Sequence, residues 1–339
     1  MTRSEPPATL IRPAEVAEDA ILRALRVPAE AAGMRLDVFV HTQLRHTSRT
    51  RARAIIERSA YSAQGRRLAA SDRVRAGEVI ALWREPFEGD EAQPALPVLY
   101  EDPHLLVIDK PPLIAVHPSA RYHHHTVKKR LEVERPGEFL ALIHRLDRET
   151  SGVLLLARSP EAERAFKWML EDRSRLETAD AAHDDFQKEY LAIAKGTPAD
   201  GSIDLPLELD PDNALRVKMR IAAPGTGMWA RTAVRVAATR GHYSLVACGL
   251  HTGRQHQIRI HLASLGHPVV GDKLYGSDEQ LLARAADGEL SADDLALLEL
   301  PRHALHAHRY RLRHPLTAEV LELVSPLPAD LQVFWDGLG

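Results

Sequence analysis

The sequence contains a single cysteine, Cys248, among 339 residues. One thiol cannot form an internal disulfide and leaves no cysteine cage for a structural zinc ion, which suits a reducing cytoplasm. Long apolar runs are missing too. No uncharged run approaches the roughly 20 residues of a membrane helix, and residues 1–20 lack the apolar centre of a signal peptide. We therefore expect a protein that stays in the cytoplasm and does not bind a membrane.

Aromatic residues are also sparse, at 5%, and the formal net charge of −3 gives no sign of a nucleic-acid partner. Hydrophobic residues at 45%, charged residues at 27% and a mean hydropathy of −0.26 are typical of a folded globular chain. This composition excludes wholesale disorder, collagen and a coiled-coil rod. At about 150 residues per domain, the length leaves room for roughly two domains.

The average charge hides a strong segregation along the chain. Residues 33–84 hold eleven arginines, no lysine and four acidic residues, a balance of +7, so the rest of the chain carries −10. Such a basic block is the electrostatic footprint of phosphate binding, although a solvated arginine-rich face is the alternative.

Two helices and a small β element are predicted inside this block. Apolar residues at helical spacing predict a helix within residues 34–44, namely Leu36, Phe39, Val40 and Leu44. Ser48 is suited to cap a second helix, which carries a row of arginines: Arg49, Arg51 and Arg53. A turn at Gly65 and a strand over residues 78–83 follow. This order resembles the S4 RNA-binding module, which implies that residues 33–85 form a small S4-like α/β domain whose arginines contact RNA phosphates.

The layout around this block follows from composition. Residues 1–32 are predicted to be an N-terminal extension, and the acidic, proline-containing residues 86–97 a solvated linker. From residue 98 onward the apolar runs are short and strand-like: 105–108, 140–143, 153–157, 190–194, 232–237 and 244–247. Ser159 and Pro160 begin one clear helix, whose apolar stripe is Ala162, Ala165, Phe166, Met169 and Leu170. Residues 98–339 are therefore predicted to be mixed α+β, decorated by acidic segments at 171–185 and 278–299.

The most informative stretch covers residues 140–158, in which two strand-like runs bracket a polar turn around Asp147. An aspartate in a turn often serves only to cap it. Here Arg145 and Arg148 flank the carboxylate, which gives it an electrostatic reason to stay ionised, as a nucleophile must.

A second polar stretch covers residues 250–276, with Arg254 and His256 near its start. If residues 256–265 are helical, Arg259 projects from the same side as His256, away from the predicted core residues Ile258, Leu262 and Leu265. One cation would then point into a site. The alternative is a strand, turn and helix with an ordinary polar face.

Two groups of histidines suggest a metal ion, one in this stretch and one at residues 122–125. No carboxylate or cysteine accompanies them at ligand spacing, so we expect no metal. The third element of interest is a predicted strand over residues 187–196, which carries Tyr190 out of line with Leu191 and Ile193. By itself, a tyrosine there indicates only a core or rim residue.

Four motifs in this order resemble those of the RluA-type RNA pseudouridine synthases. They are residues 144–147 with 150–154 (HRLD, TSGVL), 188–192 (KEYLA), 252–259 (TGRQHQIR), and 266–268 with 271–272 (GHP, GD). Residues 107–110 and 116–119 resemble the opening segment of the family, so the likeness extends from Val98 to Pro328. An S4-like module before this domain is a familiar arrangement in the family.

The resemblance implies a role for each matched residue. Asp147 corresponds to the nucleophile that detaches uracil from its ribose and reattaches it through C5, and Arg259 to the arginine that pairs with it. Tyr190 corresponds to the tyrosine that packs against the target base, and Arg145 to the arginine that fills the gap left by the flipped-out nucleotide. Further RNA or substrate contacts are expected from His144, Arg254, His256 and Ile258. No cofactor is implied, because the reaction is an isomerisation without redox change or hydrolysis.

The resemblance also implies the fold, a mixed, mostly antiparallel central sheet of the pseudouridine synthase catalytic type. The expected substrate is a uridine in structured RNA, with large-subunit ribosomal RNA as the first choice and transfer RNA as the alternative. Whether Asp147 adds to ribose C1′ or to uracil C6 stays open. Two rival classes are a catalytically silent RNA-binding or ribosome-assembly factor and a carboxylate-dependent glycoside hydrolase. The hydrolase needs a second inward-facing acid, for which neither Glu149 nor Asp272 is obviously placed.

Overall fold

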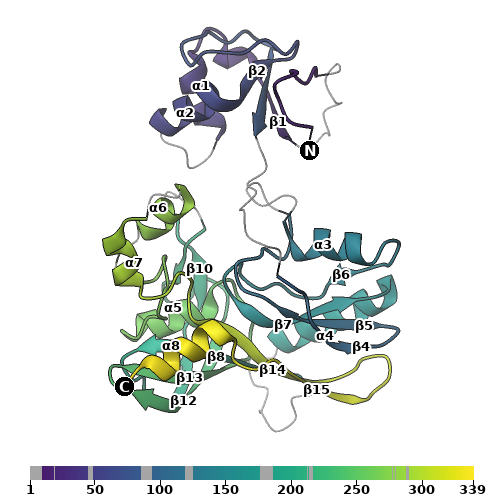
Figure 1. The fold of residues 1–339 in the computed structure, drawn as a ribbon, viewed down its shortest axis with the longest axis vertical. Coiled ribbons are helices and arrows are strands. Elements are labelled where there is room, and N and C mark those ends of the chain that lie inside the picture. The colour runs from purple at the N-terminus through teal and green to yellow at the C-terminus, as the bar shows by residue number, and fades with distance from the viewer. Residues whose placement is uncertain are drawn as a thin grey trace. The chain divides into compact units, whose positions relative to one another are not determined.

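Figure 1 shows the fold of the computed structural model. The chain divides into a small N-terminal unit and a large C-terminal unit, and each is considered by itself. The structure describes residues 10–18, 20–44, 49–84, 94–118, 125–175, 186–211, 213, 217–276, 278, 280–287 and 290–339.

The small unit packs two helices on a three-stranded antiparallel sheet of order β1-β3-β2. The strands are β1 (Ile21–Arg26), β2 (Ala60–Ser62) and β3 (Val79–Arg84), and the helices are α1 (Leu36–Gln43), α2 (Arg49–Ser59) and a single 3₁₀ turn, η1 (Ala29–Ala31). Leu36, Phe39 and Val40 of α1 are fully buried, as their helical spacing predicts. Both helices, the Gly65 turn and the strand near residues 78–83 are therefore confirmed. The predicted cap at Ser48 lies outside the described residues.

The N-terminal boundary of the small unit differs from the prediction. Strand β1 falls inside the predicted extension of residues 1–32, yet it pairs with β3 along its whole length, from Ile21 opposite Arg84 to Arg26 opposite Val79. Leu25 and Val27 join the core of this unit. The unit therefore begins at or before β1 rather than at residue 33. Three of the six residues of β1 are charged or small, so its alternation of apolar and polar residues is too weak to predict a strand from the sequence.

The large unit is built on a ten-stranded mixed sheet, which confirms the predicted class. The main path runs β4-β5-β7-β14-β8-β13-β12-β9, with β15 paired to β14 and β6 paired to β7. All pairs are antiparallel except β7 with β14. The strands are β4 (Val98–Glu101), β5 (Leu105–Lys110), β6 (Ala141–Leu142), β7 (Ser151–Ala157), β8 (Phe186–Lys195), β9 (Gly201–Asp204), β12 (Arg231–Arg240), β13 (Tyr243–Leu250), β14 (Leu305–Arg313) and β15 (Val320–Val324).

Strand β14, drawn in yellow in Figure 1, inserts between β7 and β8 and so joins the two halves of the sheet. Its close approach to β7 depends on Gly152, which has a φ of +108°. A Cβ atom at this position would collide with the carbonyl oxygen of Ala307 on β14. Because Gly152 closely follows the Asp147 turn, this contact helps to place the turn relative to β14.

Helices and a second small sheet complete the large unit. The small sheet pairs β10 (Leu207–Leu209) with β11 (Met219–Ile221), and the helices are α3 (Val127–Glu134), α4 (Pro160–Arg175), α5 (Gln257–Ser264), α6 (Leu281–Asp287), α7 (Ala292–Leu298) and α8 (Ala329–Gly337). The Ser159 hydroxyl accepts the amide of Ala162 at 3.1 Å, which confirms the predicted start of α4. Helices α6 and α7 occupy the second acidic segment. Of the first, residues 176–185 lie outside the described part.

Two further observations bear on the predicted layout. Leu96 is 9% exposed and belongs to the main core, so the last residues of the predicted 86–97 linker are part of the large unit. Residues 85–93 lie outside the described residues. Within the part of the chain that the structure describes, no helix is long and apolar enough to cross a bilayer.

Candidate active site

The turn that carries Asp147 connects β6 to β7, and two buried basic side chains hold its backbone. The Lys110 ammonium donates to the carbonyl oxygen of Arg148 at 3.1 Å, and the Arg302 guanidinium donates to that of Glu149 at 3.0 Å. Both side chains are almost completely buried. Two consecutive backbone oxygens directly after Asp147 are therefore held in place by the fold.

Asp147 and Arg259 meet, although 112 positions separate them in the chain. Arg259 Nη1 of α5 donates to Asp147 Oδ2 at 3.0 Å. The carboxylate side chain keeps 31% of its surface exposed, whereas the Arg259 side chain keeps 7%. The pair is thus a charge-assisted contact with its anion open to solvent and its cation buried.

A second carboxylate, that of Asp272, orients Arg259, and the sequence did not reveal this pairing. Asp272 accepts Arg259 Nε at 2.6 Å and Nη2 at 2.8 Å, a bidentate arrangement, and its side chain is fully buried. The charge of Arg259 holds the pKa of Asp272 well below its ordinary value despite burial. With two of its nitrogens fixed in this way, Arg259 has Nη1 left for Asp147.

The surroundings keep Asp147 ionised. Burial by itself would raise the pKa of this carboxyl. At the acidic pH where Asp147 titrates, His256 and His303 are charged. Their charges, that of Arg259 and the hydrogen bond from Arg259 outweigh burial and hold the pKa of Asp147 below its usual 3.8. An oxygen nucleophile has to be in this state at neutral pH.

His256 faces the same carboxylate from the start of α5. Its backbone adopts the left-handed conformation, with a φ of +58°, at the position before the helix. The ring places Nε2 at 3.9 Å from Asp147 Oδ1 and Nδ1 at 2.8 Å from the hydroxyl of Tyr275. Burial lowers the pKa of His256 to about 4, so the ring is neutral at physiological pH.

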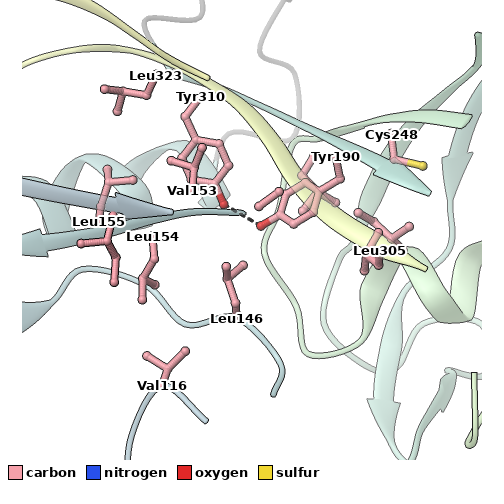
Figure 2. Close-up of a cluster of buried hydrophobic side chains, with 14 of the residues drawn as sticks. Val116, Leu146, Val153, Leu154, Leu155, Tyr190, Cys248, Leu305, Tyr310 and Leu323 are labelled. Carbon is pink, nitrogen blue, oxygen red and sulfur yellow. Dashed lines mark hydrogen bonds between the residues drawn. The ribbon is translucent and has the colours of Figure 1, made fainter. Parts of the chain in front are cut away.

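Tyr190 lies on β8 with its hydroxyl 2.6 Å from that of Tyr310 on β14. Figure 2 shows the two hydroxyl groups facing each other, with Leu146 of the Asp147 turn pointing toward them. Tyr190 is 7% exposed, and burial, reinforced by the charge of Asp147, raises its pKa to about 12. It is therefore a neutral phenol, and not a phenolate base, at neutral pH.

His144 and Arg145 precede Asp147 and have different environments. His144 Nε2 accepts the amide of Leu155 at 3.2 Å, and its ring lies 5.3 Å from that of Tyr310. Burial lowers the pKa of His144 to about 3. His144 thus supports Tyr310, whereas Arg145 is exposed beside the carboxylate turn.

Two residues at α5 were predicted to be in the core, with different outcomes. Ile258 is 3% exposed and belongs to the main core, as predicted. Leu265, predicted to face the core, is 45% exposed because the helix ends at Ser264 and the chain turns away. Arg254 is half-buried and donates through Nε to the carbonyl of Trp229 at 3.0 Å.

The three arginines predicted to contact RNA from the small unit all lie on α2. The Arg49 side chain is 60% exposed and pairs with Asp37 at 3.3 Å, and that of Arg53 is 67% exposed and pairs with Glu57 at 2.8 Å. Arg51 is half-buried. Two of the three guanidinium groups are thus anchored by a carboxylate while keeping most of their surface in solvent.

Two other carboxylates near the turn are fully engaged. Glu149 accepts Lys273 Nζ at 2.8 Å and the amide of His303 at 3.0 Å. Burial opposes ionisation, but the charges of His303 and Lys273 hold the pKa of Glu149 below its ordinary value. Glu149 and Asp272 are therefore both deprotonated at neutral pH. In the described ranges, no group of three or more His, Cys, Asp or Glu side chains is placed to hold a metal ion, and residues 119–124 lie outside them.

Comparison with known proteins shows the family of this chain. Residues 104–264 match the model of the RNA pseudouridylate synthase family. A protein named ribosomal large subunit pseudouridine synthase D from Nitrosomonas europaea is 34% identical over 91% of this chain and 85% of its own length. Its namesake from Xanthomonas campestris pv. campestris is 34% identical over 93% of this chain and 92% of its own.

Solved structures agree. Human RNA pseudouridylate synthase domain containing 4 superimposes with a TM-score of 0.52 at 25% identity, over 69% of this chain and 90% of that one. The mixed sheet and the extent of these matches define an RNA-modifying enzyme. The chain belongs to the RNA pseudouridine synthase family.

Proposed function

We propose that the chain converts uridine to pseudouridine in large-subunit ribosomal RNA, with Asp147 as the nucleophile. The observation that carries the proposal is the ionised, 31% exposed carboxylate of Asp147 paired at 3.0 Å with the buried Arg259. The choice of RNA follows the relatives, whose names assign them to the large ribosomal subunit. A cytoplasmic location is part of the same proposal.

The reaction breaks the bond between uracil N1 and ribose C1′ and forms one between C5 and C1′. A proton leaves C5 and another reaches N1, so no oxidant, reductant or water is consumed. Asp147 provides the attacking oxygen, at C1′ or at C6, and Arg259 stabilises the carboxylate and orients it. Arg145 fills the stack from which the uridine is flipped, while Tyr190 packs against the flipped base as a neutral phenol.

Arginines of the small unit supply binding energy that does not depend on sequence. Arg49, Arg51 and Arg53 of α2 contact RNA phosphates, which positions the substrate but carries no base recognition. Arg254 and His256 contact the substrate near the reacting carboxylate.

The rival classes fit these contacts less well. A glycoside hydrolase needs a protonated acid beside its nucleophile, but Glu149 and Asp272 are both held ionised by cations. A protein that only binds RNA does not need a buried arginine that is held by one carboxylate and points at a second, partly exposed one, and burying such a charge is costly.

Asp147→Asn tests the proposal. On ribosomal RNA carrying tritium at uridine C5, wild type should release tritium, and the variant should release it at least about a thousandfold more slowly, because an amide is not a nucleophile. The affinity of the variant for RNA should stay within about threefold of wild type. Retained turnover would exclude Asp147 as the nucleophile. Turnover on transfer RNA alone would overturn the choice of substrate.

A further inference from the structure

We propose that Tyr275 is a positioning residue, whose hydroxyl fixes His256 in the tautomer with its proton on Nε2 and thereby points an N–H at Asp147 Oδ1. The proposal rests on the proposed function, since it gives the second oxygen of the nucleophile its own partner. The two oxygens of the Asp147 carboxylate have unequal environments. Oδ2 is taken by Arg259, whereas within the described residues Oδ1 accepts no hydrogen bond.

The hydrogen-bond partners of Tyr275 determine where its proton goes. The hydroxyl oxygen lies 2.9 Å from the amide nitrogen of Met219 and 2.8 Å from His256 Nδ1. An amide N–H can only donate, so Met219 uses a lone pair of the hydroxyl and leaves its proton. Among the described residues, His256 Nδ1 is the one acceptor within reach of that proton. The tyrosine therefore donates to Nδ1.

The opposite side of the imidazole leads to the same tautomer. Nε2 faces the Asp147 carboxylate at 3.9 Å. If the ring proton were on Nδ1, a lone pair on Nε2 would point at this anion, and the hydroxyl proton of Tyr275 would lose its partner. With the proton on Nε2, both interactions are favourable.

The position of Tyr275 is fixed by the same short segment that holds Arg259. Asp272 Oδ1 accepts the amides of Leu274 at 2.8 Å and Tyr275 at 3.0 Å. The Tyr275 ring also lies 5.1 Å from the Arg259 guanidinium. One turn thus holds two groups against the Asp147 carboxylate: the charged Arg259, which donates to Oδ2, and the neutral His256, whose Nε2 faces Oδ1. At 3.9 Å this N–H is beyond hydrogen-bond distance and acts on Oδ1 through its dipole alone, so Oδ1 is the oxygen left to react.

The tautomer can be measured in the free protein by long-range ¹H–¹⁵N correlation of histidine rings. The signal of His256, one of 18 histidines, is identified by its loss in His256→Gln. We expect Nε2 to be protonated in wild type, and both tautomers to appear in Tyr275→Phe. A proton on Nδ1 in wild type, or no change in Tyr275→Phe, overturns the proposal. This readout needs no substrate, so it can fail or succeed independently of the proposed function.

Activity provides the second test. Tyr275→Phe should lower kcat about tenfold and leave RNA affinity within about twofold, because a lost orienting hydrogen bond acts after binding. Tyr243→Phe is the matched control, since its hydroxyl donates to Glu299 at the end of the acidic segment 278–299, and it should leave kcat unchanged. A loss in affinity alone for Tyr275→Phe would contradict a positioning role.

Two replacements of His256 separate donor chemistry from backbone strain. Glutamine can place an N–H near the position of Nε2, whereas asparagine is too short. Asparagine, however, is the better residue at a φ of +58°. We expect His256→Gln to retain about tenfold more activity than His256→Asn. A glutamine amide has no tautomers, so Tyr275→Phe should lower activity only slightly when it is added to His256→Gln. A full tenfold loss there would reduce Tyr275 to a structural role.

Discussion

Arg259 pairs with two carboxylates that differ in burial, and this difference has consequences for stability. Asp147 is partly exposed and can be solvated without Arg259, but the Asp272 side chain is completely buried and has Arg259 as its counter-ion. Removing Arg259 therefore affects two carboxylates in different ways. The exposed carboxylate loses its orientation, and the buried one loses the charge that pays for its ionisation.

Arg259→Met should consequently damage both activity and stability. We expect turnover to fall about a hundredfold, more than the affinity for RNA, because Asp147 loses its fixed donor. The free energy of unfolding in urea should drop by about 3 to 5 kcal/mol, since Asp272 stays buried and unpaired.

The double variant Arg259→Met/Asp272→Asn separates the two effects. An asparagine can still accept the amides of Leu274 and Tyr275 and carries no charge, so most of the lost stability should return. Turnover should stay low. If turnover recovered with stability, Arg259 would matter only for folding.

The pH dependence of the chemical step follows from the same groups. The pKa of Asp147 is held below 3.8, that of His256 is lowered to about 4 and that of Tyr190 is raised to about 12. A lowered carboxyl pKa means that the reactive anion is present above that pKa and is lost as pH falls through it. The single-turnover rate should therefore be flat from about pH 5 to about pH 8. An acid limb centred near pH 6 would show that another group controls the step.

At the residue scale, the sequence predicted the pair but not its supports. Asp147 and Arg259 were brought together by motif resemblance, since no local pattern connects residues 112 positions apart. Asp272 and Tyr275 lie in or next to a quoted motif, yet their partners depend on how closely the turn approaches α5. Tyr310 gave no signal, because a tyrosine in a strand is usually a core residue.

At the element scale, the β7–β14 contact helps to set the position of the Asp147 turn. These strands form the one parallel pair described in the sheet, with Ser151 opposite His306 and Gly152 opposite Ala307. The main-chain approach at Gly152 leaves no room for a side chain. The periodicity of residues 153–157 predicted a buried strand, but register with a strand 150 residues later cannot be read from alternation.

Gly152→Ala should separate these strands. We expect the free energy of unfolding to fall by at least about 3 kcal/mol, because a positive φ and a backbone collision act together. Gly137→Ala is the matched control: it also has a positive φ, of +81°, but nothing lies within 4 Å of the added methyl group. Gly137→Ala should lower the free energy of unfolding by about 1 to 2 kcal/mol. Equal losses in the two variants, measured by urea unfolding, would mean that the close approach carries no energy.

At the scale of the whole molecule, charge and chemistry are divided between the two units. The residues that surround Asp147 all belong to the large unit, whereas residues 33–84 carry a balance of +7 in a chain with a net charge of −3. Composition alone indicated this division. The boundary was less accurate, since β1 and Leu96 belong to units to which the charge pattern did not assign them.

Deleting residues 1–85 should weaken RNA binding and reduce its salt dependence, while the rate of the chemical step stays nearly unchanged. Each phosphate contact contributes about 0.7 to 0.9 to the slope of log affinity against log salt, so replacing Arg49, Arg51 and Arg53 by glutamine should lower that slope by about 2. The deletion should lower it further, and kcat at saturating RNA should stay within about threefold, because the large unit has its own core and contains the whole site. Filter-binding titrations at several salt concentrations measure the slope. An unchanged slope in both proteins would mean that the arginines of α2 do not contact phosphates, and that the large unit alone holds the RNA.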